Sequence, residues 1–110
     1  MGKQTLQHFE LHVLLAMLRE RGETYSVPLV VALEKRMERP VAQAAVFIAL
    51  GRLERKGLVT SRLGDPTPER GGRAKRYFTV TARGVHAVAR AQRAYQRLMK
   101  GLVLPGGARA

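Results

Sequence analysis

The residues with the clearest chemistry lie between Arg70 and Arg76, where four cations surround two adjacent glycines. Glycine lets a backbone approach a ligand closely, and cationic side chains neutralise phosphates with release of counterions. Turn-forming residues precede this stretch, so we expect it to occupy the tip of a β-hairpin. The alternative is a solvated charge run without a ligand. The residues predicted to contact phosphates or the minor groove are Arg70, Gly71, Gly72, Arg73 and Lys75.

A second candidate set lies between Gln43 and Arg55, a segment with the apolar spacing of a helix. With Val46 and Leu50 turned inward, the opposite face combines an amide, apolar side chains and arginines. Glutamine pairs with adenine, apolar groups contact a thymine methyl, and arginines hold phosphates. The alternative is that the apolar members belong to the core or to a protein interface. The residues predicted to contact DNA are Gln43, Ala44, Phe47, Ile48 and Arg52.

No residue pattern indicates catalysis or metal binding. The chain has no cysteine, and its two serines, Ser26 and Ser61, are expected in a helix cap and a strand. Neither a phosphate-binding Walker loop nor a pair of carboxylates with catalytic spacing is evident. His8 and His12 have the i, i+4 spacing of metal ligands, but no cysteine or carboxylate completes a set. We therefore expect a protein that is not an enzyme and needs no cofactor or metal.

Composition indicates one globular domain that binds polyanions. The chain has 110 residues, of which 45% are hydrophobic, and a formal net charge of +12. Residues 70–110 contain 10 of the 20 basic residues and no acidic residue. Such an asymmetric charge attracts nucleic acid first and an anionic membrane surface second. No apolar run is long enough to span a bilayer and no signal-peptide pattern is visible, so we expect a cytoplasmic protein that joins the nucleoid when bound to DNA.

The order of elements positions both candidate sets. Three helices, a two-stranded hairpin and a final helix predict a mainly α (α+β) winged helix-turn-helix fold with a basic wing. We divide the chain into a DNA-binding domain at 1–81, a dimerisation helix at 82–102 and a flexible tail at 103–110. The helices are expected at 5–21, 26–37, 42–56 and 82–102, and the strands at 58–63 and 76–80.

Apolar faces predict that two copies of the chain associate. The first helix has one apolar face at Leu11, Leu14, Leu15 and Leu18 and a second, roughly opposite, that is free for another chain. The last helix has apolar and aromatic residues at alternating spacings of three and four, a coiled-coil seam. We expect the dimer interface to contain Leu6, Phe9, Val13, Met17, Val85, Val88, Gln92, Tyr95, Met99 and Leu102.

Together, five segments resemble the PadR family of bacterial transcriptional regulators. They are the helix at 9–18, the start of the second helix at 25–29, the segment 50–59, the Gly-Gly-Arg wing within 68–80 and the Thr-x-x-Gly helix start at 81–84. The resemblance covers roughly residues 6–100. Where this family usually has serine, glycine and tyrosine, the chain has Ala42, Ala44 and Phe47.

The resemblance implies a homodimer that represses genes by binding a palindromic operator in double-stranded DNA. It also implies a small aromatic effector, although the chain lacks tryptophan and has only Tyr95 on the seam to stack on a flat ligand. One alternative is a winged-helix module that uses Ala44, Phe47 and Ile48 to bind another protein. RNA or a membrane surface are further alternatives for the basic wing.

Overall fold

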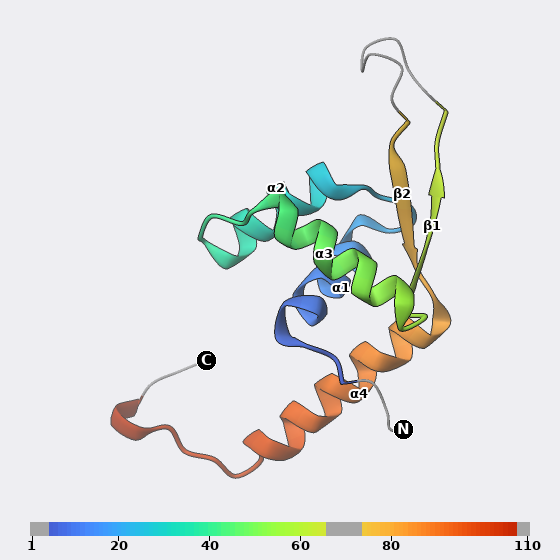
Figure 1. Ribbon diagram of the computed structural model, residues 1–110. Coiled ribbons are helices and arrows are strands. Elements are labelled where there is room, and N and C mark those ends of the chain that lie inside the picture. The colour runs from blue at the N-terminus through green and yellow to red at the C-terminus, as the bar shows by residue number, and fades with distance from the viewer. Residues whose placement is uncertain (1–4, 66–73, 108–110) are drawn as a thin grey trace.

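The computed structural model describes residues 5–65 and 74–107. Figure 1 shows three helices packed together, a hairpin projecting from them, and a last helix that runs beneath this body and beyond it. This arrangement confirms the predicted winged-helix fold. The elements are α1 (His8–Glu20), α2 (Ser26–Met37), α3 (Gln43–Arg55), β1 (Val59–Leu63), β2 (Arg76–Val80), α4 (Ala82–Met99) and the short 3-10 turn η2 (Pro105–Gly107).

One apolar core joins α1, α2 and α3 to the base of the hairpin. Leu14, Leu29 and Leu50 are all 0% exposed where these helices meet. Phe78 of β2 is 3% exposed and extends the same core under the sheet. Burying a side chain of this size contributes about 1.5–3 kcal/mol, so these contacts fix the orientation of α3.

The first helix is shorter than predicted. We expected it to begin at Thr5, but it begins at His8, because the Glu10 carboxylate accepts a hydrogen bond from the Gln7 backbone N–H at 2.9 Å and caps the first turn. At the other end, Arg21 and Gly22 have φ of 56° and 106°, in the left-handed region. These angles end the helix and turn the chain toward the sheet.

The connections around α2 differ in detail from the prediction. Ser26 was expected to cap α2, but Tyr25 is the N-cap and Ser26 is the first helical residue, 5% exposed. The turn after α2 is fixed by Glu34, whose carboxylate accepts a hydrogen bond from the Val41 N–H at 3.0 Å. This hydrogen bond joins α2 to the segment that follows Pro40 and leads into α3.

The hairpin is joined by a third short extended segment. β1 and β2 pair antiparallel with Val59 opposite Val80 and Leu63 opposite Arg76. Thr24, predicted only as part of a link, pairs with Phe78 through backbone hydrogen bonds of 3.1 and 2.7 Å. Strand β2 is therefore paired on both edges, with β1 on one edge and Thr24 on the other.

Helix α4 begins as predicted and ends earlier. The Thr81 hydroxyl accepts a hydrogen bond from the Gly84 N–H at 3.1 Å and donates to the Gly57 carbonyl at 2.8 Å, so it caps α4 and ties it to the end of α3. The helix ends at Met99, before Gly101 with φ of 76°. Leu102, predicted as its last residue, therefore lies outside the helix, and the expected tail contains the η2 turn.

Candidate nucleic-acid interface

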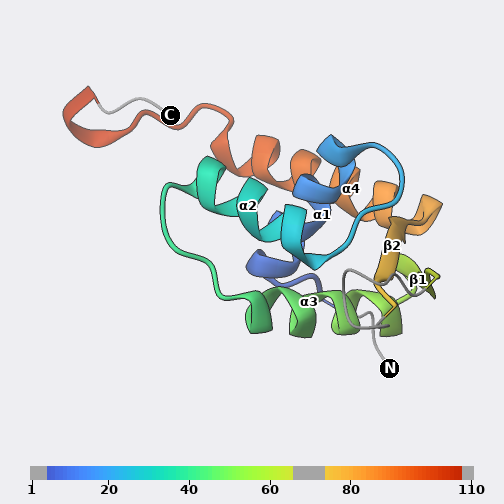
Figure 2. The ribbon, with the colours of Figure 1, turned by 90° about the horizontal axis from the view of Figure 1, so that it is seen from above.

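The five α3 residues predicted to contact DNA lie on one exposed face. Figure 2 shows α3 along one edge of the molecule, with α1 and α2 on the other side of it. Its buried face contains Val46, Leu50 and Leu53, each 0% exposed. The outward face carries two large apolar side chains, Phe47 at 48% and Ile48 at 55% exposed. The exposed residues are Gln43, Ala44, Phe47, Ile48 and Arg52.

The first polar residue of this face is held by α2. The Gln43 amide nitrogen donates a hydrogen bond to the Ser26 hydroxyl at 3.2 Å. Ser26 is 5% exposed, so the contact draws the Gln43 side chain toward the α2–α3 junction. No local sequence pattern predicts this contact, because the two residues are 17 positions apart.

Aromatic rings support the predicted phosphate-binding wing. Lys75 Nζ lies 4.4 Å from the centroid of the Tyr25 ring, and the Tyr25 and Tyr77 rings meet edge to face at 5.7 Å. The Gly64 N–H donates to the Lys75 carbonyl at 2.7 Å, which continues the strand pairing beyond β1 and β2. The sequence did not predict that Tyr25 and Tyr77 lie together beneath Lys75, because the pairing of Thr24 with Phe78 brings them together. Arg70, Gly71, Gly72 and Arg73 lie outside the described residues.

The cations near the wing and on α3 differ in whether a carboxylate neutralises them. Arg62 donates two hydrogen bonds of 2.6 Å to the Glu23 carboxylate. This hydrogen-bonded pairing raises the pKa of Arg62 and lowers the pKa of Glu23. Within residues 5–65 and 74–107, Arg52 and Arg55 of α3 form no ion pair. Arg52 and Arg55 are therefore free cations beside the apolar side chains of α3.

The structure corrects part of the expected arrangement of α1, in which only Leu14 of the four predicted inward leucines is fully buried. Val13 and Met17, predicted for the dimer interface, are 0% and 1% exposed inside the chain's own core. They cannot contact a second chain in this conformation, because α2, α3 and the sheet cover them. Leu15 and Leu18, which the prediction turned inward, are 43% and 37% exposed. Leu6 and Phe9, also predicted for the interface, are half-buried against the core.

Most of the predicted seam on α4 is exposed. Val85 is 46%, Tyr95 54% and Met99 43% exposed, and Gln92 is also at the surface. Val88 is half-buried and packs against the core. Leu102 is exposed beyond the end of the helix. Figure 1 shows the second half of α4 leaving the helical body, so no other described element covers it.

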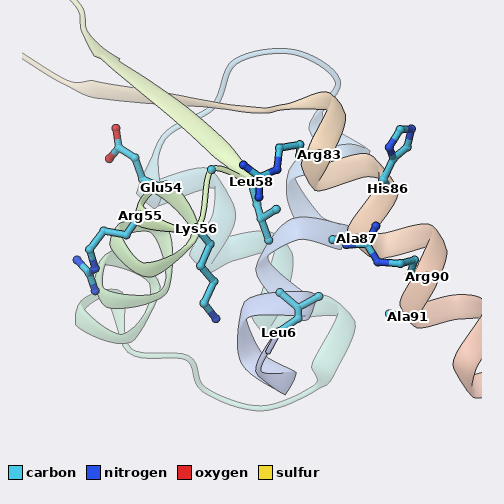
Figure 3. A pocket seen from close by; sticks show the side chains of 11 residues that line it. Leu6, Glu54, Arg55, Lys56, Leu58, Arg83, His86, Ala87, Arg90 and Ala91 are labelled. Atoms are coloured by element: carbon cyan, nitrogen blue, oxygen red, sulfur yellow. The ribbon is translucent and has the colours of Figure 1, made fainter. Parts of the chain in front are cut away.

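A basic cleft lies between the end of α3 and the first half of α4. It has a volume of about 780 Å³, and Figure 3 shows Lys56, Arg83 and Arg90 among the side chains around it. Lys56 Nζ donates to Glu10 Oε1 and to the Thr5 carbonyl, both at 2.6 Å. Glu10 is 1% exposed, so this buried ion pair joins α1 to the end of α3.

The described residues show no group of three or more histidine, cysteine or acidic side chains suited to a metal. His8 and His12 therefore have no third ligand of this kind in the part of the chain that is described. Among the described helices, none has the length and apolar character to cross a membrane.

Comparison with known proteins identifies the family. The model of the transcriptional regulator PadR-like family matches residues 14–90. The chain therefore belongs to this family, and it is a DNA-binding transcriptional regulator of the winged-helix class. The resemblance predicted from the sequence is confirmed. A search of curated proteins found no match.

Solved structures of regulators share the fold. RosR of H. salinarum matches with a TM-score of 0.71 and 20% identity over 92% of this chain and 84% of that one. A transcriptional regulator from Clostridium thermocellum matches with a TM-score of 0.68 and 16% identity, over 83% and 85% of the two chains. A PadR family regulator from Eggerthella lenta has a TM-score of 0.65 and 22% identity, over 84% and 82%.

Proposed function

We propose that the protein is a homodimeric repressor that binds a palindromic operator through α3 and the basic wing. The observation that carries this proposal is the exposed outward face of α3, which carries Arg52 and Arg55 and lies beside the hairpin. In a helix-turn-helix protein this face enters the major groove, while the wing contacts flanking phosphates. The contacts we assign to DNA are those of Gln43, Ala44, Phe47, Ile48 and Arg52 on α3, with Lys75 and the preceding Arg-Gly-Gly-Arg segment in the wing.

Exposed apolar surface supports the homodimer. Leu98 is 76% and Tyr95 54% exposed on the half of α4 that extends beyond the body. Leu15 and Leu18 add exposed apolar surface on α1. A second copy related by two-fold symmetry would cover such surface and present two α3 helices to two half-sites, which explains a palindromic operator. We assign the interface to the face of α4 that carries Val85, Tyr95 and Met99 and to the exposed face of α1 that carries Leu15 and Leu18.

We also propose that a small aromatic effector releases the operator. The cleft between α3 and α4 is a suitable place, because Leu6 and Leu58 line it together with Arg83 and Arg90. Its volume of about 780 Å³ suits a small molecule. A ligand there would contact both the end of the α3 element and the helix assigned to dimerisation.

A second candidate function rests on the apolar character of α3. Phe47 and Ile48 are each about half exposed, and such side chains are enriched at protein interfaces. In this alternative the α3 face binds another protein and the wing plays no part. Its partner would bind with little dependence on salt.

The deciding experiment is a titration of the purified protein against DNA from upstream of its own gene and a shuffled duplex of equal composition. Measurements at two salt concentrations separate phosphate attraction from base recognition. We expect a preference of about a thousandfold or more for the upstream duplex. Equal, steeply salt-dependent binding to both duplexes would contradict an operator-specific regulator. No binding to either would favour the protein-docking alternative.

A further inference from the structure

The outward face of α3 offers few hydrogen-bonding groups where a helix-turn-helix protein reads bases. The N-terminal part of the recognition helix lies nearest the base edges. In the first two turns of α3, which the structure describes completely, the exposed side chains after Gln43 are Ala44, Phe47 and Ile48. None of the three donates or accepts a hydrogen bond through its side chain. We call these three residues the apolar patch.

The single polar side chain on these turns is already engaged. A bidentate contact with adenine needs both the amide oxygen and the amide nitrogen of glutamine. The nitrogen of Gln43 donates instead to Ser26, which is 5% exposed and fixed in the first turn of α2. Hydrogen-bond reading of adenine by Gln43 therefore requires this contact to break or to be shared.

The charge around the apolar patch favours DNA as its occupant. Arg52 and Arg55 follow the patch on α3 and form no ion pair among the described residues. Lys75 of the neighbouring wing is half-buried, with its Nζ 4.4 Å from the centroid of the Tyr25 ring. A surface that is apolar at its centre and cationic at its margin suits a major groove, whose walls are phosphates and whose floor carries methyl groups.

The apolar group exposed in the major groove is the C5-methyl of thymine. Cytosine methylated at C5 presents the same group at the same ring position, although its base pair differs. We propose that this chain discriminates between DNA sequences chiefly through pyrimidine C5-methyl groups received by Ala44, Phe47 and Ile48. The inference rests on the proposed operator binding, and it makes thymine and 5-methylcytosine equivalent to the protein at the contacted positions.

Gly51 lies one turn after Phe47 on the same face and presents no side chain there. A Cβ at this position would lie 3.7 Å from the Arg55 guanidinium, so this cation lies beside Gly51. The apolar patch and its cationic margin are therefore adjacent on α3.

The test begins with selection of preferred duplexes from a random 30-base-pair library. In the best duplex, each thymine is replaced in turn by deoxyuridine, which lacks only the C5-methyl. We expect about a fourfold loss of affinity for each methyl that the patch buries. At the most sensitive position, the pair is then changed to C·G with and without C5-methylation. We expect the methylated form to bind about fourfold tighter than the unmethylated form.

Variants connect the effect to the patch. In the double variant Phe47→Ala, Ile48→Ala, the ratio of thymine to deoxyuridine affinity should approach one. Both side chains are about half exposed, and thermal melting checks that the variant stays folded. Arg52→Ala is the matched control, because loss of a cation should weaken both duplexes equally and keep the ratio.

The outcomes separate two failures. A library selection without any preferred sequence overturns the proposed operator binding and this inference with it. A preferred sequence that is bound equally with thymine or deoxyuridine at every position overturns this inference alone. A methyl effect that persists unchanged in the Phe47→Ala, Ile48→Ala variant also overturns it.

Discussion

Single residues decide how closely the elements of this fold approach, and two helical glycines show opposite cases. Gly84 lies in the first turn of α4, where a Cβ would collide with the Leu58 carbonyl oxygen and lie 2.7 Å from Val80 Cγ1. Gly51 lies on the outward face of α3, where an added Cβ has ordinary contact distances. The first glycine is required by packing against β1 and β2, whereas the second is not required for folding.

Alanine at these two positions should therefore change stability in opposite directions. Gly84→Ala should lower the free energy of unfolding by about 2–3 kcal/mol, because the backbone of Leu58 must shift. Gly51→Ala should raise it by about 0.5–1 kcal/mol, because alanine loses less conformational entropy in a helix. Urea unfolding followed by circular dichroism measures both. Equal effects of the two substitutions would contradict the packing argument.

His12 contributes a dependence of stability on pH. Burial lowers the pKa of His12 from the ordinary 6.5, and the positive charges of His8 and Arg39 lower it further. The unfolded chain therefore binds a proton at this site more readily than the folded one. The contribution of this site to the free energy of unfolding is fully present above pH 6.5. It is lost as the pH falls through the lowered pKa of the folded His12. His12→Gln should lose less stability than wild type between pH 7.5 and pH 5, as measured by urea midpoints at both values. An identical loss would show that His12 does not contribute.

At the scale of elements, α1 shows where sequence reasoning failed. A helical wheel correctly placed Leu14 in the core, but it turned Leu15 and Leu18 inward although both are exposed, and it assigned the buried Val13 and Met17 to a dimer interface. The core face includes Glu10, 1% exposed, whose charge is compensated by Lys56 from 46 positions away. A buried carboxylate is not expected from the sequence, because its partner Lys56 lies far away in the chain. Contacts between residues distant in the chain, such as this pair or Gln43 with Ser26, leave no local pattern.

Local sequence patterns correctly predicted several helix boundaries and the exposed face of α3. Helix boundaries near Gly57, Thr81 and Met37 agree with the structure within a residue or two, because glycine, a threonine cap and the Arg39-Pro40 turn each act on their neighbours. The exposed face of α3 was also predictable from its apolar spacing. The last turn of α4 was not, since a seam pattern continued through Gly101 to Leu102 although the helix ends at Met99.

The exposed half of α4 leads to a prediction about assembly. Tyr95→Asp together with Met99→Asp should convert the dimer to a monomer, because two carboxylates would be buried in the proposed interface. Both side chains are exposed in the single chain, at 54% and 43%, so its fold should persist. Analytical ultracentrifugation measures the mass. The matched control, Arg93→Ala with Arg97→Ala, lowers the net charge by the same amount without placing a carboxylate in the seam, and it should stay dimeric.

If the seam variant sediments as a dimer, the interface lies elsewhere. Leu15 and Leu18 of α1 would then be the next apolar surface to test. Val88 is unsuitable for this purpose, because it packs against the core and its substitution would disturb the fold itself.

Over the whole molecule, the positive charge is concentrated in the C-terminal part of the chain. The net charge is +12, and every cation after Arg70 lacks an acidic neighbour in the sequence. Only part of this charge is at the proposed DNA interface, since Arg93 and Arg97 are exposed on α4, whose second half leaves the body (Figure 1). The wing and α4 therefore have the same type of charge but different expected roles.

This difference can be measured as a dependence of DNA affinity on salt. Each phosphate contact contributes about 0.9 to the slope of log affinity against log salt concentration. Arg73→Ala with Lys75→Ala should therefore lower the slope by about two and weaken specific and shuffled duplexes alike. Arg93→Ala with Arg97→Ala removes the same charge from α4 and should leave the slope nearly unchanged. Equal reductions in both variants would mean that the overall charge, rather than the wing, attracts DNA. A loss confined to the specific duplex would instead assign base contacts to Arg73 or Lys75.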